Sequence, residues 1–348
     1  MTEAVGEKAF RRLREVFKPE RLLPGLIAGV LIGFSEIIDD ISFGSLIFSG
    51  ELARFLSFGI GIALATSTIL MIVTSLTSSI PGMISGTQDS SSVILSVVAA
   101  GLVATIATSS MEVKLATVLI AITLSTLLTG MFMLVVGKFK LGGLVRFIPY
   151  PVMGGFLAGT GWLLLRASFG VMTGLPLTIQ NIPALLQSSR LLIWVPGIII
   201  AFIMFFSQKR FRHALIMPGI LFGSIVLFFV ILWLAGISVE EATRQGLVVG
   251  AVSGNITWQP LVLKNLLNAN WPAIFGQASN IATILVLAVI CLLMNVSGLE
   301  LTLGRDININ RELQVAGIAN ILSGVGGGVN GVVGVQAACV IATAVWMA

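Results

Sequence analysis

The sequence IPGMISGTQDSSSV, residues 80–93, decides how the rest of the chain must be arranged. It is polar and broken by two glycines, yet long apolar stretches lie on both sides of it. Lipid does not satisfy backbone N–H and C=O groups, so broken backbone at membrane depth must be buried in protein or line a wet cavity. We therefore expect a half-length helix that begins here, capped by Thr87, Asp89 or Ser90. The alternative is a short loop capped by Asp89 before an ordinary span.

The composition sets the class of protein. Of the 348 residues, 56% are hydrophobic and only 10% are charged, and the mean hydropathy is +1.04. These values lie far from those of soluble proteins and predict an all-α polytopic membrane protein. With about 20 residues needed to cross the hydrocarbon, we expect spans at 22–48, 52–79, 90–108, 115–136, 147–167, 191–207, 214–236, 276–299, 312–328 and 331–348.

The distribution of basic residues predicts the orientation. Residues 1–21 form a basic, amphipathic leader, which we expect on the cytoplasmic face of the inner (plasma) membrane. With this leader inside, the ten spans place fourteen of the twenty lysines and arginines on the inner side, as the positive-inside rule requires. The outer side keeps Arg54, Lys114, Arg166, Arg190, Arg244 and Lys264.

Residues typical of catalysis and metal binding are scarce. Cys291 and Cys339 both lie in apolar stretches, and the single histidine, His213, lies in a basic segment. They form neither a disulfide framework nor a zinc set, and no Ser–base pair is evident. We therefore expect no enzyme, no metal site and no cofactor except a coupling Na⁺ or H⁺. The expected partners are the lipid bilayer, a small solute and a second copy in a homodimer, with no nucleic acid.

The first span combines a glycine stripe with acidic residues. Gly25, Gly29 and Gly33 recur every four residues, so we expect another helix to approach that face closely. Glu36 and Asp40 continue the stripe, and Asp39 lies beside them. A charged residue at the centre of a span costs roughly 2.5–3.5 kcal/mol even on lenient scales, so these carboxyls should face protein or water. The alternative is that the helix ends near Ile37 and the acids lie in interfacial water.

Two later segments extend the pattern. Asn295, Ser297 and Glu300 follow a long apolar run in the eighth span, where Glu300 either serves function or marks the inner boundary. The sequence GVGGGVNGVVG, residues 324–334, is a second glycine-broken interval, followed by an apolar run. Its layout matches the first interval and fits an inverted repeat whose two half-helix N-termini face each other near the midplane. The alternative is two glycine-rich helices joined by an Asn-Gly turn.

Several stretches resemble the SulP anion-permease family. They are the polar-centred first span, QDSSS at residues 88–92, FIPYPVMGGFLAGTGW at residues 147–162 and NRELQVAGIANILSGVGGG at residues 310–328. The resemblance covers about residues 23–340. It implies a 7+7 inverted-repeat transporter fold, in which a core domain moves against a gate domain and a cytoplasmic STAS domain commonly follows. It also implies a substrate site between the third and tenth half-helices, near 88–91 and 330–333.

The chain departs from the family pattern in two ways. It stops at Ala348, so we expect a truncated member with an incomplete second repeat. The first span carries three acids where sulfate-type members usually carry neutral polar residues. The expected organisation is a leader (1–21), a first inverted repeat (22–236), an extracytoplasmic connection (237–275) and a partial second repeat (276–348).

These observations define two groups of candidate site residues. The substrate-binding group is Gln88, Asp89, Ser90, Ser91, Asn330, Gly331, Val332 and Val333. The coupling group is Glu36, Asp39, Asp40, Asn295, Ser297 and Glu300. Two opposed helix N-termini each present about half a positive charge, which favours sulfate, bicarbonate or a carboxylate. The nearby acids and the absence of lysine and arginine from the span cores oppose a divalent anion.

The sequence thus predicts a secondary active transporter that works by alternating access and carries its solute in symport with protons or sodium. The family resemblance implies an inorganic anion or a carboxylate as substrate, whereas the charges favour an amino-acid zwitterion or a cationic solute. An ion channel and a non-transporting membrane scaffold remain open as alternatives.

Overall fold

The computed structural model describes residues 19–80, 83–143, 150–175, 177–211, 216–248, 263–304 and 306–333. This part is helical except for one pair of three-residue strands, which confirms the all-α class. The long helices are α2 (Pro19–Ile47), α3 (Leu56–Thr77), α4 (Asp89–Thr105), α5 (Met111–Lys138), α6 (Tyr150–Thr173), α8 (Ser188–Arg210), α9 (Ile216–Leu234), α13 (Ala278–Leu303) and α14 (Ile309–Val325). The short elements are η1 (Gly50–Phe55), η3 (Ile179–Asn181), α7 (Ile182–Leu185), α10 (Val239–Arg244), α11 (Leu263–Asn268), α12 (Trp271–Gly276), β1 (Ser85–Thr87) and β2 (Gly331–Val333).

The long helices follow the expected spans. Each of the first nine expected spans coincides with a helix to within a few residues. In the described part, five helical stretches are long and apolar enough to cross a bilayer, and α4 and α9 are shorter apolar helices. The tenth expected span begins as strand β2, and its remainder, 334–348, lies outside the described residues.

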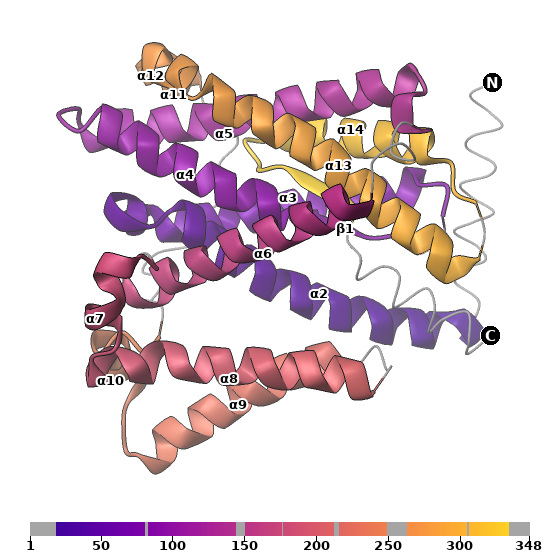
Figure 1. Ribbon diagram of the computed structural model, residues 1–348. Coiled ribbons are helices and arrows are strands. Elements are labelled where there is room, and N and C mark those ends of the chain that lie inside the picture. Colours follow the sequence, from indigo (N-terminus) through magenta and orange to yellow (C-terminus); the bar gives the residue numbers. More distant parts are fainter. Residues whose placement is uncertain are drawn as a thin grey trace.

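The helices fall into a packed group and the α8–α9 pair, which α2 and α6 contact (Figure 1). In the packed group, α3, α4, α5, α13 and α14 surround a buried apolar core. Helices α5 and α14 pack closely, because a Cβ at Gly130 would lie 2.8 Å from the Gly317 carbonyl oxygen and a Cβ at Gly317 would lie 2.8 Å from that of Gly130. Helix α6 contacts α2 and α4 on one side and α8 on the other, so it joins the packed group to the α8–α9 pair.

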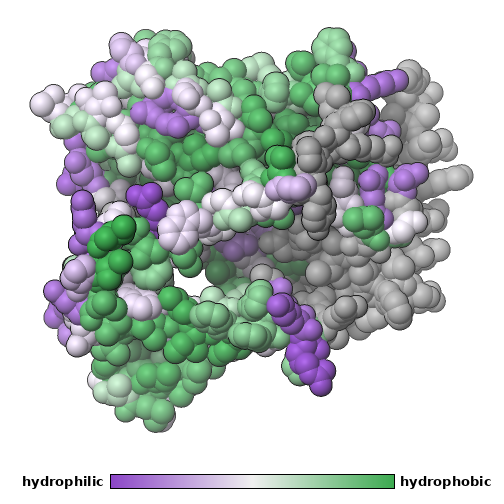
Figure 2. All heavy atoms as spheres, in the orientation of Figure 1, coloured by the Kyte–Doolittle hydropathy of each residue, from purple (hydrophilic) through white to green (hydrophobic). Residues whose placement is uncertain are grey.

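The α8–α9 pair presents an apolar surface. Phe202, Phe205, Phe222 and Phe229 are among its exposed side chains, and Figure 2 shows the apolar colour spreading over this pair. Apolar side chains facing outward are what a lipid-facing helix requires, whereas a soluble protein rarely exposes so large an apolar patch. The surface therefore agrees with the composition: this is an integral, multi-pass membrane protein.

The glycine stripe of the first span is not a helix-packing surface in the part of the chain that the structure describes. A Cβ added at Gly29 or Gly33 would have no neighbouring atom within 4 Å, so the close approach expected there is wrong for these two positions. The close contact between α2 and α3 lies farther along the helix, where a Cβ at Gly44 would come 2.9 Å from the Ile60 Cα atom. The C-terminal end of α2 is therefore the part that packs against α3.

The two glycine-broken intervals meet in the middle of the packed group. Strand β1 pairs with β2 in an antiparallel register, with Ser85 opposite Val333, Gly86 opposite Val332 and Thr87 opposite Gly331. Strand pairing satisfies backbone groups that lipid would leave unpaired. Helix α4, 17 residues long, begins directly after β1 and Gln88, which confirms the half-length third segment preceded by non-helical backbone. We call this paired region, residues 85–88 and 330–333, the strand crossing.

Candidate functional site

The first turn of α4 is organised by the side chain of Gln88. Its amide nitrogen donates to the Ser90 hydroxyl (2.9 Å), and its amide oxygen accepts from the Ser91 hydroxyl (2.8 Å). Gln88, Ser90 and Ser91 are all buried, whereas Asp89 is exposed. The Asp89 carboxylate accepts the N–H of Ser90 (2.6 Å), so it occupies part of the helix N-terminus that an anionic ligand would use. The four predicted residues therefore form one polar group.

Asp40 of α2 reaches the strand crossing and is bound there. One oxygen of its carboxylate accepts from the Ser67 hydroxyl of α3 (2.7 Å) and from the Thr87 hydroxyl of β1 (2.6 Å). The two hydroxyl oxygens are 2.9 Å apart. Asp40 is only 1% exposed. Its charge is thus held at a fixed point between two helices and a strand, and α2 continues past it to Ile47. The idea that the span ends before the acids is therefore wrong.

Glu36 and Asp39 differ from Asp40 although they belong to the same turns of α2. Glu36 is 5% exposed, and its carboxylate lies against Gly86 of β1, where an added Cβ would overlap it. Within the described residues, no side chain or backbone group donates a hydrogen bond to it. Asp39 is half-buried and lies close enough to Asp89 for the two carboxylates to repel each other. One α2 carboxyl is therefore bound, one is buried without a donor and one faces a like charge.

On the β2 side, the predicted residues support the strand crossing. Asn330 is fully buried; its amide donates to Thr129 (2.7 Å) and accepts from Ser125 and Thr126 (3.2 and 3.3 Å), all on α5. Its carbonyl accepts the N–H of Gln88 (3.0 Å). The side chain of Asn330 thus points toward α5 and makes its hydrogen bonds there.

The three residues of β2, Gly331–Val333, are fixed by close packing and strand pairing. A Cβ at Gly331 would overlap Leu70 and lie 2.6 Å from the Gly86 carbonyl oxygen, so only glycine fits this close approach. Val332 is buried in an apolar cluster with Ile80 and Met83. Val333 pairs with Ser85 through the strand register.

On α13, the residue that contacts the first turn of α4 is not one of the three predicted polar residues. Glu300 accepts the N–H of Ile307 (2.8 Å), so its carboxylate binds the loop after the helix, as the boundary interpretation expects. Asn295 and Ser297 are half-buried. The residue of α13 that reaches the first turn of α4 is Cys291, whose Sγ lies 3.4 Å from the Ser90 hydroxyl oxygen.

Sequence reasoning missed three residues of this site: Ser67, Thr87 as a ligand of Asp40, and Cys291. Ser67 is a polar residue inside a mainly apolar helix, a signal that could have been used. Cys291 gave no such signal, because a cysteine in an apolar run is typical of ordinary packing.

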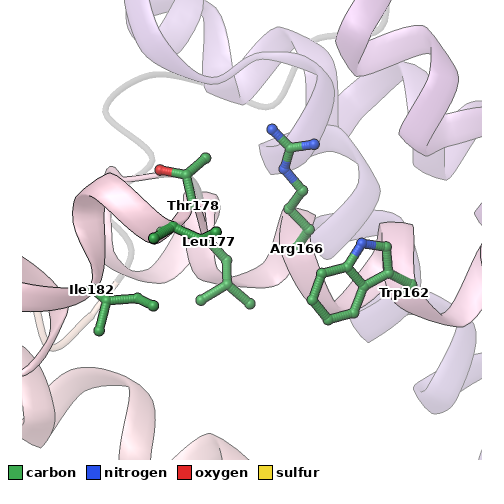
Figure 3. Close-up of a pocket in the computed structure, with 6 residues that line it drawn as sticks. Trp162, Arg166, Leu177, Thr178 and Ile182 are labelled. Carbon is green, nitrogen blue, oxygen red and sulfur yellow. The ribbon is translucent and has the colours of Figure 1, made fainter.

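A separate pocket of about 370 Å³ lies beside the C-terminal half of α6 (Figure 3). It is lined by Trp162 and Arg166 of α6 and by Leu177, Thr178, Ile179 and Ile182 of the segment that follows. It shares no residue with the strand crossing. The chemistry described above is therefore not located in this pocket.

The charges around the strand crossing are all negative. Glu36, Asp39, Asp40 and Asp89 gather there, and within the described ranges the ion pairs are Lys114–Glu51 and Arg244–Glu241, which involve none of them. Broken backbone at the centre of a multi-pass helical domain, paired across two segments far apart in sequence, is the arrangement that secondary transporters use for their ligand sites. The fold and the site define this class: a multi-pass membrane protein with the broken-helix architecture of secondary transporters.

Residues 22–344 match the Sulfate permease family, and the chain belongs to that family. The transmembrane domain of a cyanobacterium bicarbonate transporter, BicA, superposes with a TM-score of 0.68 at 21% identity, covering 94% of this chain and 78% of that one. This likeness confirms the inverted-repeat transporter fold. The vacuolar basic amino acid transporter VSB1 of Saccharomyces cerevisiae is 23% identical over 213 residues, which are 59% of this chain. The match spans 21% of the length of that relative.

Proposed function

We propose that this protein is a secondary active transporter that carries a small cationic or zwitterionic amino acid by alternating access. Its coupling ion is a proton or sodium, held by the carboxyls of α2. The observation that carries the proposal is the set of four carboxyls at the strand crossing, none of which pairs with a lysine or arginine in the described residues. The N-terminus lies on the cytoplasmic side in this proposal, as the distribution of basic residues favours.

Electrostatics support a cationic group in the ligand. Asp39 and Asp89 repel each other, and an ammonium or guanidinium group between them would replace that repulsion by two attractions. A divalent anion at the same place would face at least these two negative charges. The yeast relative is a transporter of basic amino acids, which agrees with this choice.

The carboxyls also support coupling. Glu36 is buried and receives no hydrogen bond in the part described, so its charge is uncompensated unless a proton or cation accompanies it. Asp40 already has two hydroxyl donors. A carrier that loads Glu36 on one side of the membrane and releases it on the other would couple the solute to that ion.

A second candidate is the transport of an inorganic anion such as sulfate or bicarbonate. The N-terminus of α4 points its free N–H groups toward the strand crossing, which favours an anion. The family and the bicarbonate transporter of similar fold agree with it. In this case the α2 carboxyls would have to be neutralised by co-transported protons or sodium.

Purified protein in liposomes tests the proposal. Labelled L-arginine, L-glutamine, sulfate and bicarbonate are offered separately, and saturable counterflow of one solute distinguishes a transporter from a channel or a scaffold. An inwardly or outwardly directed pH gradient is then imposed, and sodium is replaced by choline at fixed pH. One coupled proton per solute supports about tenfold accumulation per pH unit.

Glu36→Gln combined with Asp40→Asn should leave counterflow measurable and reduce gradient-driven accumulation to a ratio near one. Glu112→Gln is the matched control, because Glu112 is an exposed glutamate in the first turn of α5. If the double variant still concentrates its solute in response to either gradient, the α2 carboxyls do not couple transport. If sulfate or bicarbonate is exchanged and L-arginine is not, the anion candidate replaces the amino-acid proposal.

A further inference from the structure

Helix α14 binds the backbone on both approaches to the strand crossing. At its N-terminal end, the Glu312 carboxylate accepts from the Ser78 hydroxyl (2.9 Å), the Ser79 N–H (2.9 Å) and the Ser79 hydroxyl (2.6 Å), before β1 begins. Farther along, the Ser323 hydroxyl donates to the Val329 carbonyl (3.2 Å) just before β2. Asn320 lies between these two anchors on the same helix.

Asn320 binds strand β2 through both the oxygen and the nitrogen of its side-chain amide. Its Oδ1 accepts the N–H of Gly331 (2.9 Å), and its Nδ2 donates to the carbonyl of the same residue (2.7 Å). Its Nδ2 also donates to the Ala316 carbonyl (2.8 Å), which fixes the side chain to its own helix. Gly331 lies opposite Thr87 in the strand pair, so the amide takes the place of a third strand on the outer edge of β2.

A short series of hydrogen bonds links Asn320 to the candidate ligand residues. Asn330 directly precedes the strand that Asn320 holds, and its carbonyl accepts the N–H of Gln88. Gln88 in turn orients the hydroxyls of Ser90 and Ser91. Asn320 is fully buried, and its amide groups are occupied as described, so it acts on the site only through this backbone.

We infer that Asn320 is a positioning residue of the transport site. Its amide fixes where β2 lies relative to α14, and thereby the geometry of the first turn of α4. The inference rests on the proposed function for its transport readout. Its geometric content is independent of which solute is carried.

Asn320→Asp gives the sharpest perturbation, because the side chains have the same shape. The acceptor for the Gly331 N–H is kept, but the bonds that Nδ2 donates to the Ala316 and Gly331 carbonyls and to Met133 Sδ are lost. A carboxylate oxygen then faces the two carbonyls. Asn310→Asp is the matched control on the same helix. Its Oδ1 accepts the N–H of Gly142 (2.9 Å), which lies just after the C-terminal end of α5 and outside the strand crossing.

The first readout is uptake of labelled L-arginine into liposomes at equal protein amounts. Asn320→Asp should raise KM by about tenfold while Asn310→Asp leaves it within about twofold. Rescue by Asn320→Gln is not expected, because the longer side chain displaces the strand that it should hold. A fall in Vmax with unchanged KM for Asn320→Asp, or an equal rise in KM for both variants, overturns the inference.

The second readout does not require transport. In a Cys339→Ser background, the rate of N-ethylmaleimide labelling reports the surroundings of Cys291, which contacts Ser90. Asn320→Asp should change this rate by at least about threefold, and Asn310→Asp should not. An unchanged labelling rate refutes the positioning role even if L-arginine is transported. A changed rate in a protein that carries no amino acid supports the positioning role and refutes only the proposed substrate.

Discussion

Gly86→Ala should uncouple transport by displacing a carboxylate. A Cβ at this position of β1 would overlap the carboxylate of Glu36. Glu36 is only 5% exposed, so its carboxylate cannot move into solvent without rearranging its neighbours. Overpacking of this kind costs roughly 1–3 kcal/mol. The overlapping atoms belong to the flexible end of a side chain, so the fold should survive.

The magnitude can be measured by a double-mutant cycle. Gly86→Ala should lower the apparent Tm in detergent by roughly 2–10 °C. Glu36→Asp withdraws the carboxylate by one C–C bond, about 1.5 Å, so the double variant should recover most of that loss. The coupling free energy between the two sites should be about 0.5–3 kcal/mol, the range for residues in contact.

Gly33→Ala is the control, because it adds the same methyl group to the helix that carries Glu36 but meets no atom within 4 Å. It should leave Tm and transport close to those of the unaltered protein. Gradient-driven accumulation should fall for Gly86→Ala, while counterflow persists. A Gly86→Ala protein with unchanged Tm and full accumulation, or strictly additive effects with Glu36→Asp, would show that Glu36 does not pack on β1.

Two further predictions follow from the hydrogen bonds. Ser67→Ala and Thr87→Val each remove one hydroxyl donor from the buried Asp40 carboxylate, and each lost bond to a charged group costs about 1.5–3 kcal/mol. Both variants should lower the substrate affinity measured by uptake. Thr68→Ala should not, because its exposed hydroxyl bonds to its own helix. Glu312→Gln weakens three hydrogen bonds that a fully buried carboxylate accepts, so it should lower the Tm measured in detergent without changing KM. A selective effect on KM would contradict its structural role.

The sequence alone determined the class of protein, the positions of the spans and the break before the third half-helix. These features depend on local properties: the length of apolar runs, and the glycines and polar residues that interrupt them at residues 80–93. Backbone that lipid cannot satisfy has few solutions, so the pattern was sufficient to predict half-length helix α4. The glycine pattern at residues 324–334 located the second interval in the same way.

The tertiary structure decided what each polar residue does. Glu36, Asp39 and Asp40 lie within two turns of one helix, yet one packs on a strand, one faces Asp89 and one is bound by hydroxyls that lie 27 and 47 positions away in the chain. Likewise, Asn330 turns its amide toward α5, 201–205 positions away, rather than toward the ligand site. Helical spacing fixes which residues share a face, but their partners come from other helices, and only the packing of those helices brings them together.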